Sequence, residues 1–301
     1  MLVRDFRCFP EGRWDFQGSK VWVTGPNGSG KSSLLEAMAF GSWLESYRGA
    51  TLAEVVRKGA REARVTVVFR DGLVRVPVYL RLAPRRLRGM AARAPIQRAD
   101  HRARVPVFVF APETLLLREA GLRRFFFRWF STVSPAHAFL EARLARLLRM
   151  RREVLRRGAQ PSEVLFSVFR QHAEALWEER RRLWRAWQGA GVQWKPAEPA
   201  ETRDWWRAFQ AGRALVWHPL RDRFFWREPL SRGQGLRAGA RLLIRASEML
   251  ERPPLWLWDE VLAELDGAGR RELLQAARRY TVVLASVRRW REFPADEVVR
   301  L

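Results

Sequence analysis

KVWVTGPNGSGKSSLLEAMA, the stretch from Lys20 to Ala39, decides the fold of this chain. Its first residues are apolar and predict a short buried strand over Lys20–Thr24. Gly25–Ser32 follows and matches G-x-x-x-x-G-K-[ST] at every position. The residues after the loop have helical composition. A strand, a glycine-rich loop and a helix in this order are the setting that a phosphate-binding loop requires, so the sequence predicts an α/β domain.

The loop predicts a site for ATP and Mg²⁺. Its glycines let successive backbone N–H groups turn toward a phosphate, and the helix that follows adds the positive end of its dipole. We expect Lys31 to reach the β- and γ-phosphates and Ser32 to coordinate Mg²⁺. The predicted nucleotide contacts of the loop are Gly25, Pro26, Asn27, Gly28, Ser29, Gly30, Lys31, Ser32 and Ser33. The alternative is a glycine-rich turn with a chance lysine, which the flanking strand and helix disfavour.

A second apolar strand ends in two acids. Leu255–Trp258 is followed directly by Asp259 and Glu260. At the carboxyl end of a parallel strand beside the phosphate loop, Asp259 is placed to coordinate Mg²⁺, and Glu260 to orient or deprotonate the attacking water. We therefore predict both as catalytic residues, with Ser32 and Asp259 as metal ligands. Acids after a strand are also common in the first turn of a helix, which is the alternative for this pair.

Charge and composition restrict the partners. The chain has 301 residues, 56 basic against 32 acidic, and a net charge of +24, so nucleic acid is the favoured partner and an anionic membrane the second. Only four basic residues are lysines, a bias that GC-rich coding also produces. The single cysteine, Cys8, excludes an internal disulfide and a zinc hook. No apolar run reaches the roughly 18 residues of a membrane span, so we expect a soluble, cytoplasmic protein with no membrane partner.

We expect three segments along the chain: residues 1–130 and 213–301 as two parts of one α/β unit, and residues 131–212 as an inserted helical subdomain. Residues 63–70 and 73–80 predict an antiparallel hairpin, because each run alternates around an Asp-Gly turn signal. Two amphipathic helices are predicted within the insert. Residues 81–104, with eight arginines against one acid, are expected to form an exposed basic loop, and Gly189–Pro199 a further loop.

A third motif brings a family resemblance. Leu230-Ser231-Arg232-Gly233-Gln234 resembles the L-S-x-G-Q signature of ABC-type ATPases, and the order of motifs along the chain resembles the SMC and RecF branch of that family. The resemblance implies an ABC-type ATPase head with a short antiparallel helical lobe. It also implies an ATP-dependent homodimer, in which the signature of one copy caps the nucleotide held by the other. Ser231, Gly233, Gln234 and, from the segment after Glu260, Asp266 are the nucleotide contacts that it implies.

Within that branch the chain resembles the RecF family most. Asp5–Phe9 resembles the opening N-F-R-N-[FY], Ser46–Arg48 resembles [ST]-F-R, and Val109–Glu113 resembles V-L-F-[SA]-P-E-D. Leu122–Phe126 resembles R-R-R-F-L-D, and an arginine-rich helix follows in both. The chain departs from the family at Glu260, where a second aspartate is common. SMC proteins would need long heptad arms, and this insert has room for about 80 residues only.

The resemblance implies a slow, DNA-stimulated ATPase of recombinational repair. Such a protein would bind duplex DNA and single-strand gap junctions, and would assist RecA loading together with RecO and RecR-like mediators. Two alternatives remain open. One is an ABC-type ATPase subunit of a transporter, which the charge and the basic stretches disfavour. The other is a nucleotide-gated effector or defence ATPase of the same branch.

Two stretches hold most of the excess positive charge. They are Arg81–Arg104 and Arg123–Arg157, and backbone-directed, salt-sensitive DNA binding is expected from them. The predicted DNA contacts are Arg85, Arg86, Arg88, Arg149, Arg151 and Arg152. The alternative is that these arginines only form a solvated surface.

Overall fold

The structure is a computed structural model that describes residues 1–71, 74–83, 86–91, 94–95, 106–111, 119–195, 209–210, 223–226 and 230–301. These residues form two compact units. The first contains Met1–Leu117 and Ser231–Leu301, and the second contains Arg118–Leu230. The second unit contains more residues at both ends than the insert expected over residues 131–212. Helix α4 (Glu119–Val133) extends it toward the N-terminus and strand β10 (Arg223–Trp226) toward the C-terminus, because α4 packs both on α5 (Pro135–Arg156) and on β10.

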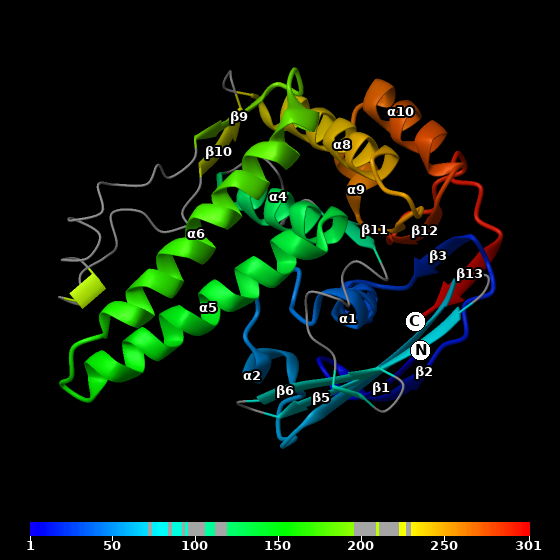
Figure 1. Cartoon of the computed structure of the whole chain (residues 1–301). Helices are drawn as coiled ribbons and strands as arrows, with labels where there is room; N and C mark the ends of the chain where they lie inside the picture. The colour runs from blue at the N-terminus through cyan, green and yellow to red at the C-terminus, as the bar shows by residue number, and fades with distance from the viewer. Residues whose placement is uncertain are drawn as a thin grey trace. The chain divides into compact units, whose positions relative to one another are not determined.

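A parallel five-stranded sheet forms the centre of the first unit (Figure 1). Its order is β13-β3-β12-β11-β8, and every neighbouring pair is parallel. The strands are β3 (Lys20–Thr24), β8 (Val107–Phe110), β11 (Leu255–Asp259), β12 (Thr281–Ala285) and β13 (Glu297–Arg300). The side chains of Trp256, Leu257 and Trp258 are fully buried, as expected for a strand covered on both faces. Parallel pairing brings the carboxyl ends of β3 and β11 to the same edge of the sheet.

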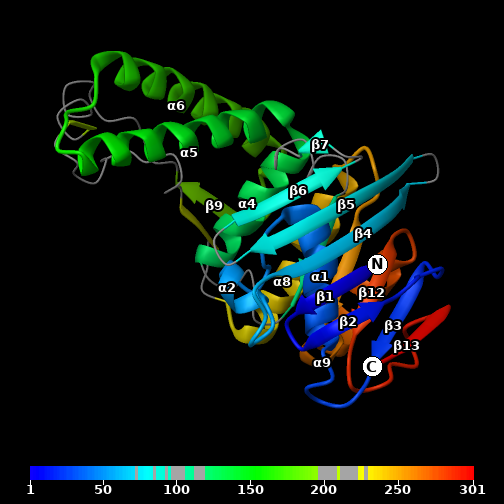
Figure 2. The ribbon, with the colours of Figure 1, turned by 90° about the horizontal axis from the view of Figure 1, so that it is seen from below.

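An antiparallel sheet of six strands, in the order β2-β1-β4-β5-β6-β7, forms the second layer (Figure 2). The strands are β1 (Leu2–Phe6), β2 (Phe9–Arg13), β4 (Ala63–Asp71), β5 (Val74–Ala83), β6 (Arg86–Ala91) and β7 (Ala94–Pro95). The predicted hairpin is confirmed, since β4 and β5 pair antiparallel from Ala63–Leu82 to Asp71–Val74. The basic loop expected over residues 81–104 is wrong in part, because residues 86–91 form β6 along the free edge of β5.

Helix α1 (Lys31–Trp43) lies between the two sheets (Figure 1). Leu34, Leu35 and Met38 pack into the core on the parallel sheet, and Ala37 and Phe40 into the core on the antiparallel sheet. A helix that packs against a sheet on each of two sides needs apolar residues on both, which its sequence supplies. Among the described residues, the remaining helices of this unit are α2 (Leu52–Val55), α8 (Arg232–Glu248), α9 (Val261–Glu264) and α10 (Gly267–Ala277).

The second unit is built on α4, α5 and α6 (Glu163–Trp184), followed by a 3₁₀ turn at Arg185–Trp187. Helices α5 and α6 run antiparallel beside each other (Figures 1 and 2). Strand β9 (Val192–Lys195) pairs with β10, which corrects the loop expected over Gly189–Pro199. Aromatic residues join these parts, since Phe126 stacks on Phe224 at 4.8 Å and meets Trp187 edge-on at 5.0 Å. Helices long and apolar enough to cross a membrane do not occur among the described residues.

Candidate nucleotide-binding site

The loop after β3 is open at its tip and crowded at its base. Pro26, Asn27 and Gly28 are exposed. Gly30 begins α1 with φ 100°, and a Cβ atom there would lie 2.6 Å from the ring of Phe9 and 2.7 Å from Cys8 Sγ. Only glycine accommodates both this left-handed conformation and the close approach of the β1–β2 turn. No side chain caps the start of α1, so its first N–H groups need an acceptor from outside the helix.

Lys31 points back into the loop. Its ammonium donates to the carbonyl oxygens of Gly25 at 3.0 Å and Pro26 at 2.9 Å, and the residue is only 7% exposed. The positive charge and the dipole of α1 therefore lie on the same side of the loop. This arrangement suits an anion held by the backbone N–H groups.

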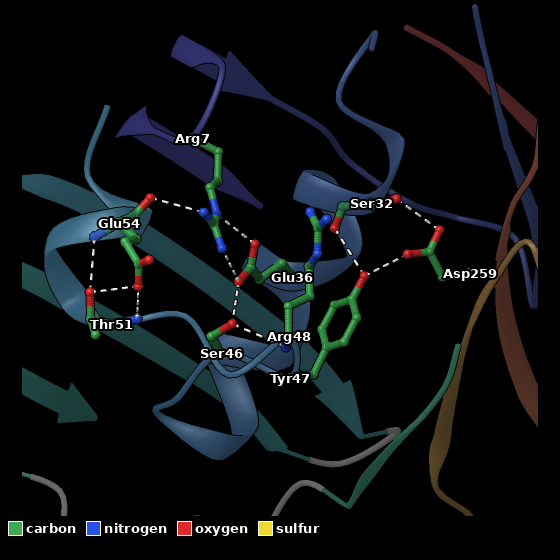
Figure 3. A network of polar contacts seen from close by, with 9 residues as sticks. All are labelled: Arg7, Ser32, Glu36, Ser46, Tyr47, Arg48, Thr51, Glu54 and Asp259. Carbon is green, nitrogen blue, oxygen red and sulfur yellow. Dashed lines mark hydrogen bonds and ion pairs between the residues drawn. The ribbon is translucent and has the colours of Figure 1, made fainter. Parts of the chain in front are cut away.

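The two motifs meet at Asp259. Ser32, at the start of α1, donates through Oγ to Asp259 Oδ1 at 2.9 Å, and Tyr47 donates through its hydroxyl to Asp259 Oδ2 at 2.7 Å (Figure 3). The Tyr47 hydroxyl also lies 3.3 Å from the carbonyl oxygen of Ser32. Burial, together with the nearby carboxylate of Asp259, raises the pKa of Tyr47 well above its usual range, so the phenol stays protonated and can donate.

Glu260 is held in an uncommon backbone conformation. Its φ is 53°, although it is not glycine, and its N–H donates to the carbonyl of Ala285 at 2.9 Å. Oε1 accepts a hydrogen bond from the N–H of Val287 at 2.9 Å, which leaves the other carboxylate oxygen for a further contact. Burial raises the pKa of Glu260; Lys31 opposes this shift and Asp259 adds to it. A partly buried carboxylate with a raised pKa, on a residue whose backbone is strained, is typical of a functional site.

A second polar cluster lies beside the first on α1 (Figure 3). Glu36 is fully buried and accepts two hydrogen bonds from Arg7, at 2.7 and 2.8 Å, and one from the hydroxyl of Ser46. Arg7 also donates to the carbonyl of Glu54 at 2.9 Å. The cluster fixes the segment after α1 to the helix itself. Neither Glu36 nor the hydroxyl of Tyr47 was predicted as a site residue, because their partners are distant in sequence.

The predicted signature forms the start of α8. Ser231 Oγ accepts from the N–H of Gln234, and Gln234 accepts from the N–H of Ser231 at 2.9 Å, so the two residues form a capping box. Ser231, Gly233 and Gln234 are all exposed. Arg232 pairs with Glu264 at 2.8 Å. Asp266 caps α10 by accepting from Gly269 at 2.8 Å and pairs with Arg237 on α8, so its predicted nucleotide contact stays a prediction beside these structural roles.

The predicted DNA contacts lie in different surroundings. Arg149 and Arg152 are exposed on α5. Arg151 is buried at 7% exposure, donates to the carbonyl of Phe209 at 2.9 Å and lies over its ring, so its predicted DNA contact stays a prediction beside this internal contact. Arg85 lies outside the described residues. Arg86 and Arg88 belong to β6, but their side chains are not described.

The oxygen donors of Ser32 and Asp259 fit Mg²⁺. A hydroxyl and a carboxylate 2.9 Å apart, beside a loop suited to phosphates, provide the hard oxygen ligands that Mg²⁺ prefers. Mg²⁺ commonly takes one or two protein ligands and completes its shell with substrate phosphates and water. Within the described part of the chain, no three His, Cys, Asp or Glu side chains gather as a metal centre, so a cage made of protein ligands alone is not formed there.

Comparisons with known proteins place the chain beside relatives of one name. A family model described as an AAA domain matches residues 1–74. The DNA replication and repair protein RecF of Anaeromyxobacter dehalogenans strain 2CP-C is 33% identical over 176 residues, which cover 54% of this chain and 46% of the relative. In this match the chain spans less than half the length of the relative. The same-named protein of Anaeromyxobacter sp. strain K is 31% identical over 309 residues, which cover 84% of this chain and 81% of the relative.

Solved structures show the same fold. A structure of the recombination mediator protein RecF-ATPrS in the RecFOR pathway superposes with a TM-score of 0.80 at 15% identity, covering all of this chain and 94% of the other. A RecF-ATP structure gives 0.78 at 17% identity, over 96% of this chain and 91% of the other. The long match at 31% identity extends beyond the phosphate loop to most of both chains. The chain therefore belongs to the RecF family.

Proposed function

We propose that this chain is an ATP-dependent DNA-binding ATPase of recombinational repair. The observation that carries the proposal is the 2.9 Å hydrogen bond between Ser32 and Asp259. It joins two residues that lie 227 positions apart in sequence. Ser32 follows β3 and Asp259 ends β11, and the carboxyl ends of these two strands share one edge of the sheet. Phosphate-loop ATPases need these two oxygen ligands side by side. Family membership and the likeness to a fold described as RecF-ATP support ATP as the nucleotide.

The proposed chemistry assigns one task to each group. Lys31 and the N–H groups of the loop bind the phosphates, and Ser32 and Asp259 would hold Mg²⁺, which would neutralise charge on the phosphate oxygens. Glu260 orients a water molecule through its free carboxylate oxygen and accepts a proton from it. The water oxygen bonds to the γ-phosphorus, the bond to the bridging oxygen breaks, and ADP leaves with that electron pair. The proton on Glu260 returns to solvent. We propose that this turnover is slow and stimulated by DNA.

ATP is also proposed to close a homodimer. The exposed start of α8, with Ser231 and Gly233, offers N–H groups and a helix dipole to the γ-phosphate of ATP held by a second copy. The closed dimer would bind duplex DNA at single-strand gaps in the cytoplasm and would help RecO and RecR-like mediators to load RecA. The sequence also raised two other functions, a transporter subunit and a nucleotide-gated effector. No observation on the described residues favours either of them over the proposed function.

A surface on α5 supports the DNA half of the proposal. Arg143, Arg146, Arg149 and Arg152 are exposed and recur every three residues along the helix. Among the described residues none of the four forms an ion pair, whereas on α6 Arg170, Arg181 and Arg182 each pair with a glutamate. Where no carboxylate offsets the charge of a guanidinium group, the group attracts phosphates more strongly. We call the four residues the α5 arginine row.

Replacing Glu260 with glutamine tests the proposal. The substitution keeps the hydrogen bond from Val287 and removes the proton acceptor, so we expect turnover to fall by about 10²- to 10⁴-fold while ATP binding persists. The variant should accumulate as an ATP-bound dimer in size-exclusion chromatography and should bind gapped duplex DNA in that state. Glu272→Gln, on α10 and paired with Arg241, is the matched control. Unchanged turnover in Glu260→Gln would contradict the assigned chemistry and would make Asp266 the next residue to test.

A further inference from the structure

The carboxylate of Asp259 is held by two donors from different parts of the chain. Ser32 at the start of α1 bonds Oδ1, and Tyr47 from the segment after α1 bonds Oδ2. Asp259 is 8% exposed and Tyr47 is 2% exposed. With one oxygen tied to each donor, the plane of the carboxylate is fixed, and Oδ1 faces the hydroxyl that would share the cation (Figure 3).

Tyr47 is itself fixed before any ligand binds. Its neighbour Ser46 bonds the fully buried carboxylate of Glu36, and the N–H of Arg48 donates back to Ser46 Oγ at 3.1 Å. Glu36 in turn receives the two hydrogen bonds from Arg7. The tyrosine hydroxyl therefore reaches Asp259 from a segment that is anchored to α1, so little conformational entropy is lost in holding the carboxylate.

We propose that Tyr47 is a positioning residue that orients Asp259 for the divalent cation of the nucleotide. This inference rests on the proposed ATPase function. The hydroxyl of Tyr47 does not touch the nucleotide in this role; it acts through Asp259, by preventing rotation of the carboxylate away from Ser32. Partners of this kind, one step removed from the metal, commonly change metal affinity by about 10- to 100-fold when they are removed.

Tyr47→Phe tests the inference, because it removes the hydroxyl and keeps the buried ring. The probe is Mn²⁺ with a non-hydrolysable ATP analogue, and the Kd of Mn²⁺ is measured by electron paramagnetic resonance. We expect Mn²⁺ to bind about 10- to 100-fold more weakly, with analogue affinity in EDTA unchanged. Tyr280→Phe is the matched control, since Tyr280 is a buried tyrosine that stacks on Trp256 at 4.3 Å and has no contact with Asp259.

Two results would overturn the inference: an unchanged Mn²⁺ affinity, or an equal loss of analogue affinity with EDTA and with Mn²⁺, which indicates a general structural role. A double-mutant cycle separates a direct effect of Tyr47→Phe on Mn²⁺ binding from an effect of lost stability. In an Asp259→Asn background the added effect of Tyr47→Phe on Mn²⁺ binding should vanish, and an additive effect contradicts direct positioning. Failure of the wild-type protein to bind the analogue with Mn²⁺ at all would instead refute the proposed function.

Discussion

Helices α1 and α8 both begin beside predicted nucleotide motifs, but their N-termini are built differently. The residue before α1 is a glycine with φ 100°, and the helix has no side-chain cap. The residue before α8 is Ser231, which forms a capping box with Gln234. An uncapped start leaves N–H groups that need an outside acceptor, whereas a capped start satisfies part of them within the chain.

The difference indicates an order of events. The start of α1, with Lys31 beside it, is prepared for a phosphate in the single chain. The start of α8 is stable alone, and its exposed N–H groups gain a strong acceptor only when another copy presents a phosphate. Nucleotide binding would thus come first and dimer closure second. Variants that damage one N-terminus and spare the other should separate the two events.

The largest expected effect is that of Lys31→Ala. Charge-assisted hydrogen bonds contribute about 1.5–3 kcal/mol each, so loss of two such bonds from the ammonium to the β- and γ-phosphates should weaken ATP binding by about 100-fold or more. Isothermal titration with ATP and Mg²⁺ measures this loss. Lys58→Ala, which removes an exposed lysine outside the loop, is the control. Wild-type affinity in Lys31→Ala would refute a nucleotide site at α1.

Substitutions in the α5 arginine row, which is part of neither α1 nor α8, are expected to have a smaller effect, and on DNA binding only. Replacing Arg146, Arg149 and Arg152 by glutamine should weaken DNA binding and reduce the slope of log K against log salt by up to about 3, since each phosphate contact contributes about −0.9. ATP affinity should not change. The comparison triple is Arg170, Arg181 and Arg182, whose charges are paired on α6. Equal loss in both triples would show that net charge, and not the row, controls DNA binding.

Local patterns predicted the elements that carry the site. The strand before the loop, the strand before Asp259 and the hairpin of β4 and β5 all appear within a few residues of their expected positions. Strand β6 and the pairing of β9 with β10 were missed. Strand β6 contains two arginines and a glycine, and two glycines, Gly189 and Gly191, precede β9. The edge of a partner strand, which no local pattern reveals, stabilises these segments as strands.

Side-chain surroundings were harder to predict. The contact between Tyr47 and Asp259 spans 212 residues, and no spacing rule points to it. The burial of Arg151 did have a signal, because Leu144, Leu147 and Leu148 precede it at helical intervals on the buried face of α5. A positive charge favours a surface position, although a guanidinium can also pack on an aromatic ring and bond a carbonyl inside a core.

The most direct test of the composite site is a complementation experiment with two variants. Lys31→Ala lacks a working phosphate loop and keeps its signature. Ser231→Arg keeps the loop, and although losing the cap costs about 1 kcal/mol of stability, it should still bind ATP. A mixture of the two contains one complete site per pair, formed by Lys31 of one chain and Ser231 of the other. The measurement is light scattering during size-exclusion chromatography with a non-hydrolysable ATP analogue and Mg²⁺. We predict monomers for each variant alone and a dimer only in the mixture. A dimer of either variant alone, or none in the mixture, would contradict the account.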